Sequence, residues 1–261
     1  MDYLETIAYI HQMPKFSRAL GNDMLRKLLD HLGNPHRSLK FVHIAGTNGK
    51  GSAAAMLAEI LRCSNLRTGL FISPYIQVFN ERIQVDGCMI EDQELAEIVT
   101  HIRQVMEREN CPVSEFALDF TAALMYFCQK KCDVVVLETG MGGRLDATNV
   151  IEESVVSILM TISLDHTQYL GDTVEAIAAE KCGIIKPNGR VVLYPLQQDS
   201  VKAVVEHFCK EQGAKLVQAA MPVPMENGLV WNGKRYQLGL RGGFQAYNAA
   251  TVLEAVKVLR D

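Results

Sequence analysis

A glycine-rich loop near the start of the chain carries the groups that best suit phosphate binding. It follows an apolar run that starts at Phe41 and precedes an Ala/Leu-rich segment with helical spacing. Backbone amides in such a loop point the same way and the helix dipole adds positive potential, so a phosphate chain is stabilised there. Lys50 would add a charge for the outer phosphates and Ser52 a hydroxyl. The candidate nucleotide-binding residues are Gly46, Thr47, Asn48, Gly49, Lys50, Gly51 and Ser52.

The loop departs from the strict P-loop pattern on both sides of Lys50. Ile44 stands five residues before Gly49, where the pattern has glycine, and Gly51 takes the place of the usual serine or threonine. A glycine-rich turn with an incidental lysine is therefore the alternative interpretation.

Polar side chains also follow other predicted strands. Ser73 comes after one apolar run, Glu138 ends another, and Asp165 and His166 follow a third. Ligands bind at the carboxyl ends of parallel strands, so these side chains should converge near the loop. A phosphate-bound Mg²⁺ needs only one or two protein oxygens. Taken singly, Ser73 could be a turn residue, Glu138 a capping acid and His166 a structural histidine.

The elements that must position these residues follow from hydrophobic periodicity. Predicted strands cover 41–46, 68–72, 133–137, 155–162, 191–194 and 215–217. Predicted helices cover 2–12, 22–32, 53–63, 92–108, 114–130 and 245–259, with another that Asp199 or Ser200 caps and Gly213 ends. This alternation predicts an α/β fold with a doubly wound, mainly parallel sheet. Asn232-Gly233, between 229–231 and 235–238, predicts a small β-hairpin with a type I′ turn.

The composition is that of a globular protein. The chain has 261 residues, 48% hydrophobic and 21% charged, with a net charge of -4 and no block of like charges, which argues against nucleic acid or an anionic membrane as a partner. The start lacks the features of a secretory signal, and the longest apolar run, 154–163, is shorter than the roughly 20 residues that span a bilayer. We expect a cytoplasmic protein whose seven cysteines are reduced thiols.

Several segments, in order, resemble the motifs of the folylpolyglutamate synthase and dihydrofolate synthase branch of the Mur ligase superfamily. They are HIAGTNGKGS (43–52), FISPYIQVFNERI (71–83), ETGMGGRLDATN (138–149), DHTQYLGDTVEAIAAEKCGIIKP (165–187) and GGFQAYNAATVLEA (242–255). Met141 and Cys182 depart from the residues usual in that branch. The resemblance covers nearly the whole chain.

The resemblance assigns roles to individual residues. It implies that Ser73 and Glu138 ligate a first Mg²⁺, and that Glu138 and His166 serve a second. Lys181 matches a lysine that the family carbamylates. The nucleotide would also meet Gln245 and Asn248, and the substrate-binding residues would be Asp146, near a pterin ring, and Arg82. Lys50, Glu138, His166 and Lys181 are the expected catalytic residues.

The implied activity is that of an ATP-dependent ligase that joins L-glutamate to folate or dihydropteroate through an acyl phosphate. Family members have a second, glutamate-binding domain, so residues 1–261 look like an ATP-binding domain that by itself lacks full activity. We expect a monomer. One alternative is a nucleotide-binding module without turnover. The other is a Mur-type ligase with another carboxylate acceptor, and the GKGS loop and the DATN motif disfavour this second alternative.

Overall fold

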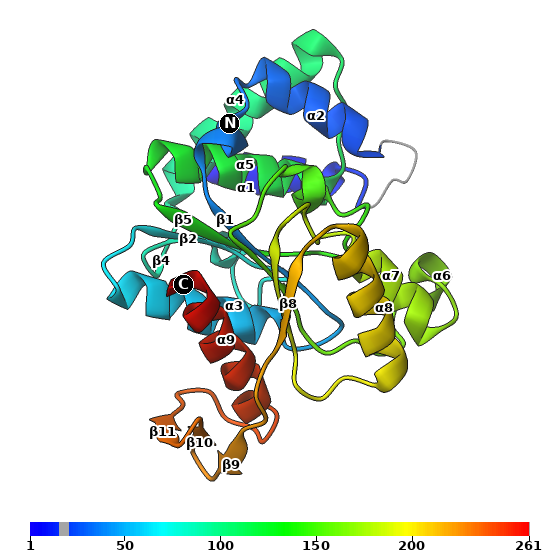
Figure 1. Cartoon of the computed structure of the whole chain (residues 1–261). Helices are drawn as coiled ribbons and strands as arrows, with labels where there is room; N and C mark the ends of the chain where they lie inside the picture. The colour runs from blue at the N-terminus through cyan, green and yellow to red at the C-terminus, as the bar shows by residue number, and fades with distance from the viewer. Residues whose placement is uncertain (16–20, 261) are drawn as a thin grey trace.

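The computed structural model describes residues 1–15 and 21–260, and Figure 1 shows a central sheet with helices on both faces. Its strand order is β4-β3-β2-β5-β1-β6-β7-β8. The strands are β1 (Phe41–Ala45), β2 (Thr68–Phe71), β3 (Ile83–Val85), β4 (Cys88–Met89), β5 (Val134–Glu138), β6 (Val156–Leu159), β7 (Arg190–Leu193) and β8 (Lys215–Gln218). From β2 to β8 in this order, neighbours pair in parallel, so their carboxyl ends share one edge. This confirms the predicted fold class.

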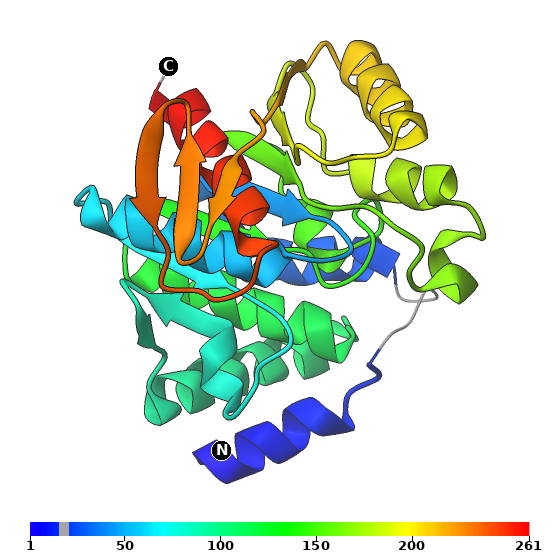
Figure 2. The same cartoon turned by 90° about the horizontal axis from the view of Figure 1, so that it is seen from below.

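One face of the sheet is covered by α3 (Lys50–Cys63) and α9 (Gln245–Arg260), which lie side by side in Figures 1 and 2. Alternation along β1 explains this arrangement, because Val42 and Ile44 point to that face and pack with both helices. All residues of β1 are buried, as expected for a central parallel strand.

The other face carries the remaining long helices. Phe41 and Ala45 of β1 point to this side. The helices are α1 (Tyr3–Gln12), α2 (Gly21–His31), α4 (Asp92–Glu109), α5 (Glu115–Gln129), α7 (Val174–Cys182) and α8 (Asp199–Glu211). Short helical turns join them: η1 (Pro35–Ser38), η2 (Phe79–Arg82), η3 (Ala147–Val150) and α6 (Thr167–Leu170).

The C-terminal hairpin is confirmed and is part of a larger sheet. Asn232 and Gly233 both have positive φ, as a type I′ turn requires, between β10 (Gly228–Trp231) and β11 (Lys234–Gln237). A further strand, β9 (Val223–Met225), pairs with β10 and was not predicted. Leu229 and Trp231 attach this sheet to α9.

Several boundaries and elements differ from the prediction. The N-cap of α8 is Gln198, so the prediction of Asp199 or Ser200 is wrong; Asp199 is already helical and pairs with Lys202 one turn on. The antiparallel β3–β4 hairpin was missed although its turn, Asp86-Gly87, is a hairpin signal. Helix α7 was also missed.

In the part of the chain that the structure describes, no helix is long and apolar enough to cross a membrane. The seven cysteines are all free: Cys63, Cys88, Cys111, Cys128, Cys132, Cys182 and Cys209. This agrees with the expected reduced thiols.

Candidate active site

The phosphate loop connects β1 to α3 at the carboxyl edge of the sheet. Gly49 is the N-cap of α3 with a left-handed φ of 84°, so Lys50 is the first helical residue. A Cβ on Gly49 would lie 2.6 Å from the Asn248 side-chain oxygen. Both the backbone conformation and this close approach therefore require glycine at this position.

The loop is held by its neighbours on both sides. The Thr47 amide donates to the Thr161 carbonyl at 2.6 Å, just beyond β6. On the other side, the Gln245 amide group donates to Ser52 Oγ at 3.2 Å, and Asn248 donates to Gln245 Oε1 at 3.0 Å. The structure thus brings the predicted nucleotide residues of α9 to the phosphate loop, although 193 positions separate Gln245 from Ser52.

Glu138, the last residue of β5, lies beside the first turn of α3. Its Oε2 accepts a hydrogen bond of 3.0 Å from the Ser73 amide, and a Cβ on Gly51 would be 3.4 Å from the same oxygen. Burial raises the pKa of Glu138 to about 7, while the Ser73 amide and the charge of Lys50 oppose that shift. The predicted pair of Ser73 and Glu138 is therefore adjacent, at the start of the phosphate loop helix.

His166 is placed differently from these two residues. It is the left-handed N-cap of α6, its side chain is half exposed, and its Nε2 lies 3.7 Å from Asp165 Oδ2. The described residues contain no cluster of three or more His, Cys, Asp or Glu side chains that could hold a metal by themselves. Any metal here would need oxygens from a phosphate chain, and the role of His166 remains a prediction.

Lys181 reaches the phosphate loop from α7. Its side chain is buried, and Nζ donates to the Gly46 carbonyl at 2.9 Å. Burial, together with the charge of nearby Lys50, lowers the pKa of Lys181 to about 8. A substantial fraction of its amine is therefore neutral near physiological pH.

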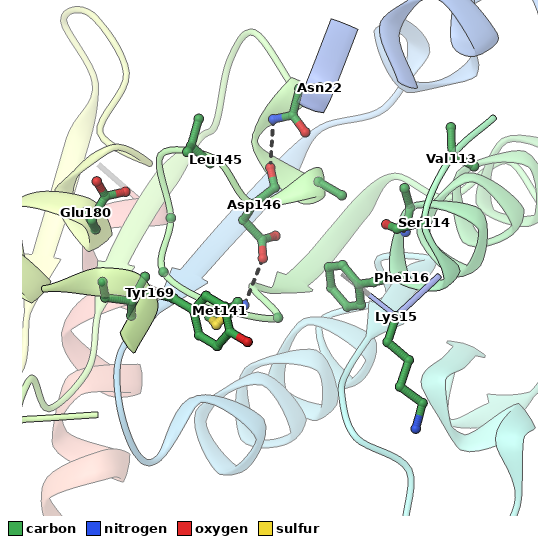
Figure 3. Close-up of a pocket in the computed structure, with 16 residues that line it drawn as sticks. Lys15, Asn22, Val113, Ser114, Phe116, Met141, Leu145, Asp146, Tyr169 and Glu180 are labelled. Carbon is green, nitrogen blue, oxygen red and sulfur yellow. Dashed lines mark hydrogen bonds between the residues drawn. The ribbon is translucent and has the colours of Figure 1, made fainter. Parts of the chain in front are cut away.

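A cavity of about 290 Å³ opens beside these residues, and Figure 3 shows its wall. Asp146 lies in that wall; its Oδ2 accepts from the Met141 amide at 2.9 Å, and its backbone carbonyl accepts from Asn22 at 3.0 Å. The other side chains are mostly apolar or aromatic, including Val113, Phe116, Met141, Leu145, Tyr169 and Leu170. Such a wall suits a flat heteroaromatic ligand with a few polar atoms.

A buried chain of hydrogen bonds through Thr148 and His43, here called the relay, holds Asp146 in place and was not predicted from the sequence. Thr148 Oγ1 donates to Asp146 Oδ1 at 2.5 Å, so its only proton is used. His43 Nε2, 2.8 Å from the same hydroxyl, must then be the donor to Thr148. Burial lowers the pKa of His43 to about 3, so its ring is neutral. His43, in β1, thus fixes the orientation of a carboxylate in the cavity.

Arg82 lies outside the wall of this cavity. Its guanidinium packs over the rings of Tyr75 and Phe79 and stands 3.7 Å from Asp119 Oδ2 on α5. Asp119 is 1% exposed, and neither of its carboxylate oxygens has a hydrogen-bond partner in the described structure. Burial raises the pKa of Asp119 to about 8, although Arg82 opposes the shift. The substrate-binding role of Arg82 stays a prediction.

The sequence profile of the Mur ligase middle domain matches residues 44–256, which is most of the chain. The chain belongs to the Mur ligase family. It is 37% identical over 277 residues to the folylpolyglutamate synthase of Lacticaseibacillus casei, an alignment that covers 99% of this chain and 64% of that protein. It is 36% identical over 217 residues to the dihydrofolate synthase/folylpolyglutamate synthase of Bacillus subtilis, with 81% and 50% covered.

Solved structures agree with this family assignment. A structure described as an FPGS-AMPPCP-folate complex superposes on this Mur ligase domain with a TM-score of 0.92 at 36% identity, covering 99% of this chain and 67% of the other. The chain therefore spans about half to two thirds of the length of these three proteins.

The relay in this Mur ligase domain predicts a stability effect. The variant His43→Leu should lower the free energy of unfolding by about 1 to 3 kcal/mol, because the buried Thr148 hydroxyl loses its donor. The variant His43→Gln keeps an N–H group near Nε2 and should recover part of that loss. Urea unfolding measures both, with the exposed His207→Gln as the control. If His43→Leu is no less stable than the control, the relay contributes nothing.

Asp119 predicts a pH effect on stability. Its pKa in the folded state is about 8, above its ordinary value of 3.8. Between about pH 4 and 8, the folded state therefore binds one proton at Asp119 that the unfolded state does not bind. Its contribution to stability is therefore full below pH 4 and is lost as the pH rises towards 8. Relative to Asp119→Asn, the wild type should lose more than about 1 kcal/mol between pH 5 and 9.

The measurement is urea unfolding of wild type and Asp119→Asn at both pH values. The exposed Asp23→Asn serves as the control for a surface carboxylate. An equal difference between wild type and Asp119→Asn at the two pH values would show that Asp119 does not titrate in this way.

Proposed function

We propose that this chain is the ATP-binding part of a ligase that joins L-glutamate to folate or dihydropteroate. One observation carries the proposal: the phosphate loop, Glu138 and Lys181 meet at the edge of the sheet beside a cavity suited to a flat ring. The similarity to a protein whose structure is described with AMPPCP and folate supports ATP and a folate as ligands.

The chemistry requires activation of a carboxylate. An acceptor carboxylate oxygen attacks the γ-phosphorus of ATP, and the bond from this phosphorus to the bridging oxygen breaks. ADP departs with that oxygen, and the acceptor becomes an acyl phosphate. The glutamate amine then attacks the acyl carbon, phosphate leaves with the C–O electron pair, and the amine loses a proton. Lys50, the first residue of α3, would balance charge on the transferring group, which is the main requirement of phosphoryl transfer.

The residues beside the loop fit a magnesium ion. Hard oxygen ligands suit Mg²⁺, and the Ser73 hydroxyl and the Glu138 carboxylate are such ligands. The two residues are joined by a hydrogen bond of 3.0 Å from the Ser73 amide to Glu138 Oε2. When bound with ATP, Mg²⁺ would neutralise phosphate charge and orient the chain of phosphates. A second ion at Glu138 and His166 is part of the proposal.

We further propose that Lys181 is carbamylated. Carbamate formation needs the neutral amine, and the lowered pKa of Lys181 supplies it near pH 8. An unmodified ammonium would be repelled by Lys50 and by metal ions, whereas a carbamate would be attracted. The modified side chain would then support a metal ion or its waters.

The cavity would hold the pterin end of the acceptor. The Asp146 carboxylate accepts from the amide and hydroxyl of Thr148, from the Met141 amide and from the Gly140 amide. These bonds fix its orientation in the wall, where it would attract a ring N–H or amino group of the pterin. The apolar side chains around it would cover the faces of the ring.

We propose that the glutamate-binding domain lies outside residues 1–261, since the relatives that the chain matches are longer. The 261-residue chain should bind Mg-ATP but incorporate little glutamate, because the amine lacks the positioning that can provide about 7 to 11 kcal/mol. We expect it to be a monomer in light scattering.

The test combines ATP binding, ADP release and incorporation of labelled glutamate into dihydropteroate or a folate. Mg-ATP binding that the acceptor strengthens supports the ligase. Mg-ATP binding with no effect of either acceptor indicates a nucleotide-binding module or another carboxylate substrate. Incorporation of glutamate at a rate typical of the longer relatives would overturn the proposed domain assignment.

A further inference from the structure

A second cavity, of about 350 Å³, lies beside the same two elements that border the first one. Helix α2 gives Asn22 to the first cavity and Arg26, one turn on, to the second. The second shared element is η3. Its N-cap, Asp146, lines the first cavity, and its residue Asn149 lines the second. The phosphate loop does not line it.

Lys186 is a largely buried cation in this wall. Its Nζ donates to Asn149 Oδ1 at 2.9 Å and to the Ile151 carbonyl at 2.5 Å, and both acceptors are uncharged. An ammonium has three donors, so one remains. Within the described ranges, no carboxylate lies within 4.0 Å of Lys186. Burial, followed by the charge of Arg26, lowers the pKa of Lys186 to about 8, although the charge of Glu152 opposes the shift.

Other donors surround Lys186. Among the described residues, Arg26 forms an ion pair only with Asp23, at 3.5 Å, and that carboxylate is 97% exposed, so the pair is weak. His36 is 7% exposed, and its Nδ1 has no hydrogen-bond partner among the described residues. Burial, and then the charge of Arg37, lowers the pKa of His36.

The two carboxylates of the wall are already engaged. Glu152 accepts from Arg37 at 3.3 Å, and Asp30 accepts from the Asn34 side chain at 2.9 Å. The cavity therefore presents an ammonium, a guanidinium and an imidazole with donor capacity to spare, while its acidic groups have partners.

We propose that this cavity binds a phosphate-type oxyanion. Its donors come from three separate elements, α2, η1 and the segment just before β7, which suits a tetrahedral anion better than the two coplanar oxygens of a carboxylate. The anion would give Lys186 the charged partner that it lacks. It would also link α2 to η3, the two elements that hold Asp146 in the first cavity.

The experiment uses inorganic phosphate with the 261-residue chain. Saturating Mg-ADP first fills the phosphate loop, and phosphate is then titrated by calorimetry at pH 7 and low ionic strength. We expect one phosphate site to remain, together with a rise in Tm, because a ligand that binds only the folded state stabilises it. The variant Lys50→Ala, without ADP, should keep this site.

Two variants test the residues. Lys186→Met should weaken phosphate binding by about 10-fold or more, the effect of losing a charge-assisted hydrogen bond. Arg26→Gln, at a position whose side chain is 55% exposed, should weaken it as well and leave the Tm without phosphate unchanged. Lys202→Met, on α8, is the matched control and should bind normally. The proposal is overturned if Mg-ADP abolishes all phosphate binding, or if Arg26→Gln binds phosphate as well as the control.

Discussion

Replacement of Lys50 by alanine is expected to weaken Mg-ATP binding by about 1.5 to 3 kcal/mol, or roughly 10- to 150-fold. Nζ makes a 3.3 Å hydrogen bond to the Thr47 carbonyl, a long contact that the ammonium can exchange for a phosphate oxygen. Lys50 is also the first residue of α3, so its charge adds to the positive end of the helix dipole.

The measurement is calorimetric titration of Mg-ATP into wild type, Lys50→Ala and the control Lys202→Ala. Thermal melting shows whether each variant is folded. The charge of Lys50 attracts Glu138 and repels Lys181, and these two effects on stability oppose each other, so we expect similar Tm values without nucleotide. Equal ATP affinity in Lys50→Ala and the control would refute the assignment of this loop to phosphate binding.

Lys181→Ala should have the other large effect. We expect acceptor-dependent ADP release to fall by about 100-fold, the scale of losing one preorganised electrostatic contact in an active site. A short carboxylate such as acetate should restore part of the activity, because it can take the place of the carbamate.

A direct readout separates carbamylation from a purely structural role. With ¹³C-bicarbonate, the wild type should give a carbamate NMR signal that Lys181→Ala lacks. The signal should grow as the pH rises from 7 towards 9, because the amine, with its pKa of about 8, becomes neutral. Lys202→Ala is the control. If wild type at high bicarbonate with Mg²⁺ and nucleotide gives no signal dependent on Lys181, carbamylation is excluded.

Some site residues could be predicted from a short stretch of sequence, and others could not. Gly49 and Lys50 could be assigned from a short stretch, because a strand, a glycine-rich turn and a helix are local features. Gln245 and Asn248 could be assigned only through the family resemblance. Their contact with the loop depends on α9 packing against α3, which no local pattern encodes.

Some features were absent from the sequence reasoning for a physical reason. His43 looked like one residue of an apolar strand, and its role appears only when Thr148 lies across from it. Lys186 and Arg26 are 160 positions apart in the chain, and their common cavity exists because α2 packs beside the segment before β7. Long-range packing brings such groups together.

The sequence by itself determined the α/β class, the parallel sheet and the phosphate loop, because each follows from short-range periodicity and turn chemistry. The tertiary structure alone decided that Glu138 is buried against the first turn of α3, that Lys181 meets Gly46, and that Arg82 pairs with Asp119. Those facts set the pKa values of the site, since desolvation and charge pairing depend on which distant segments pack together.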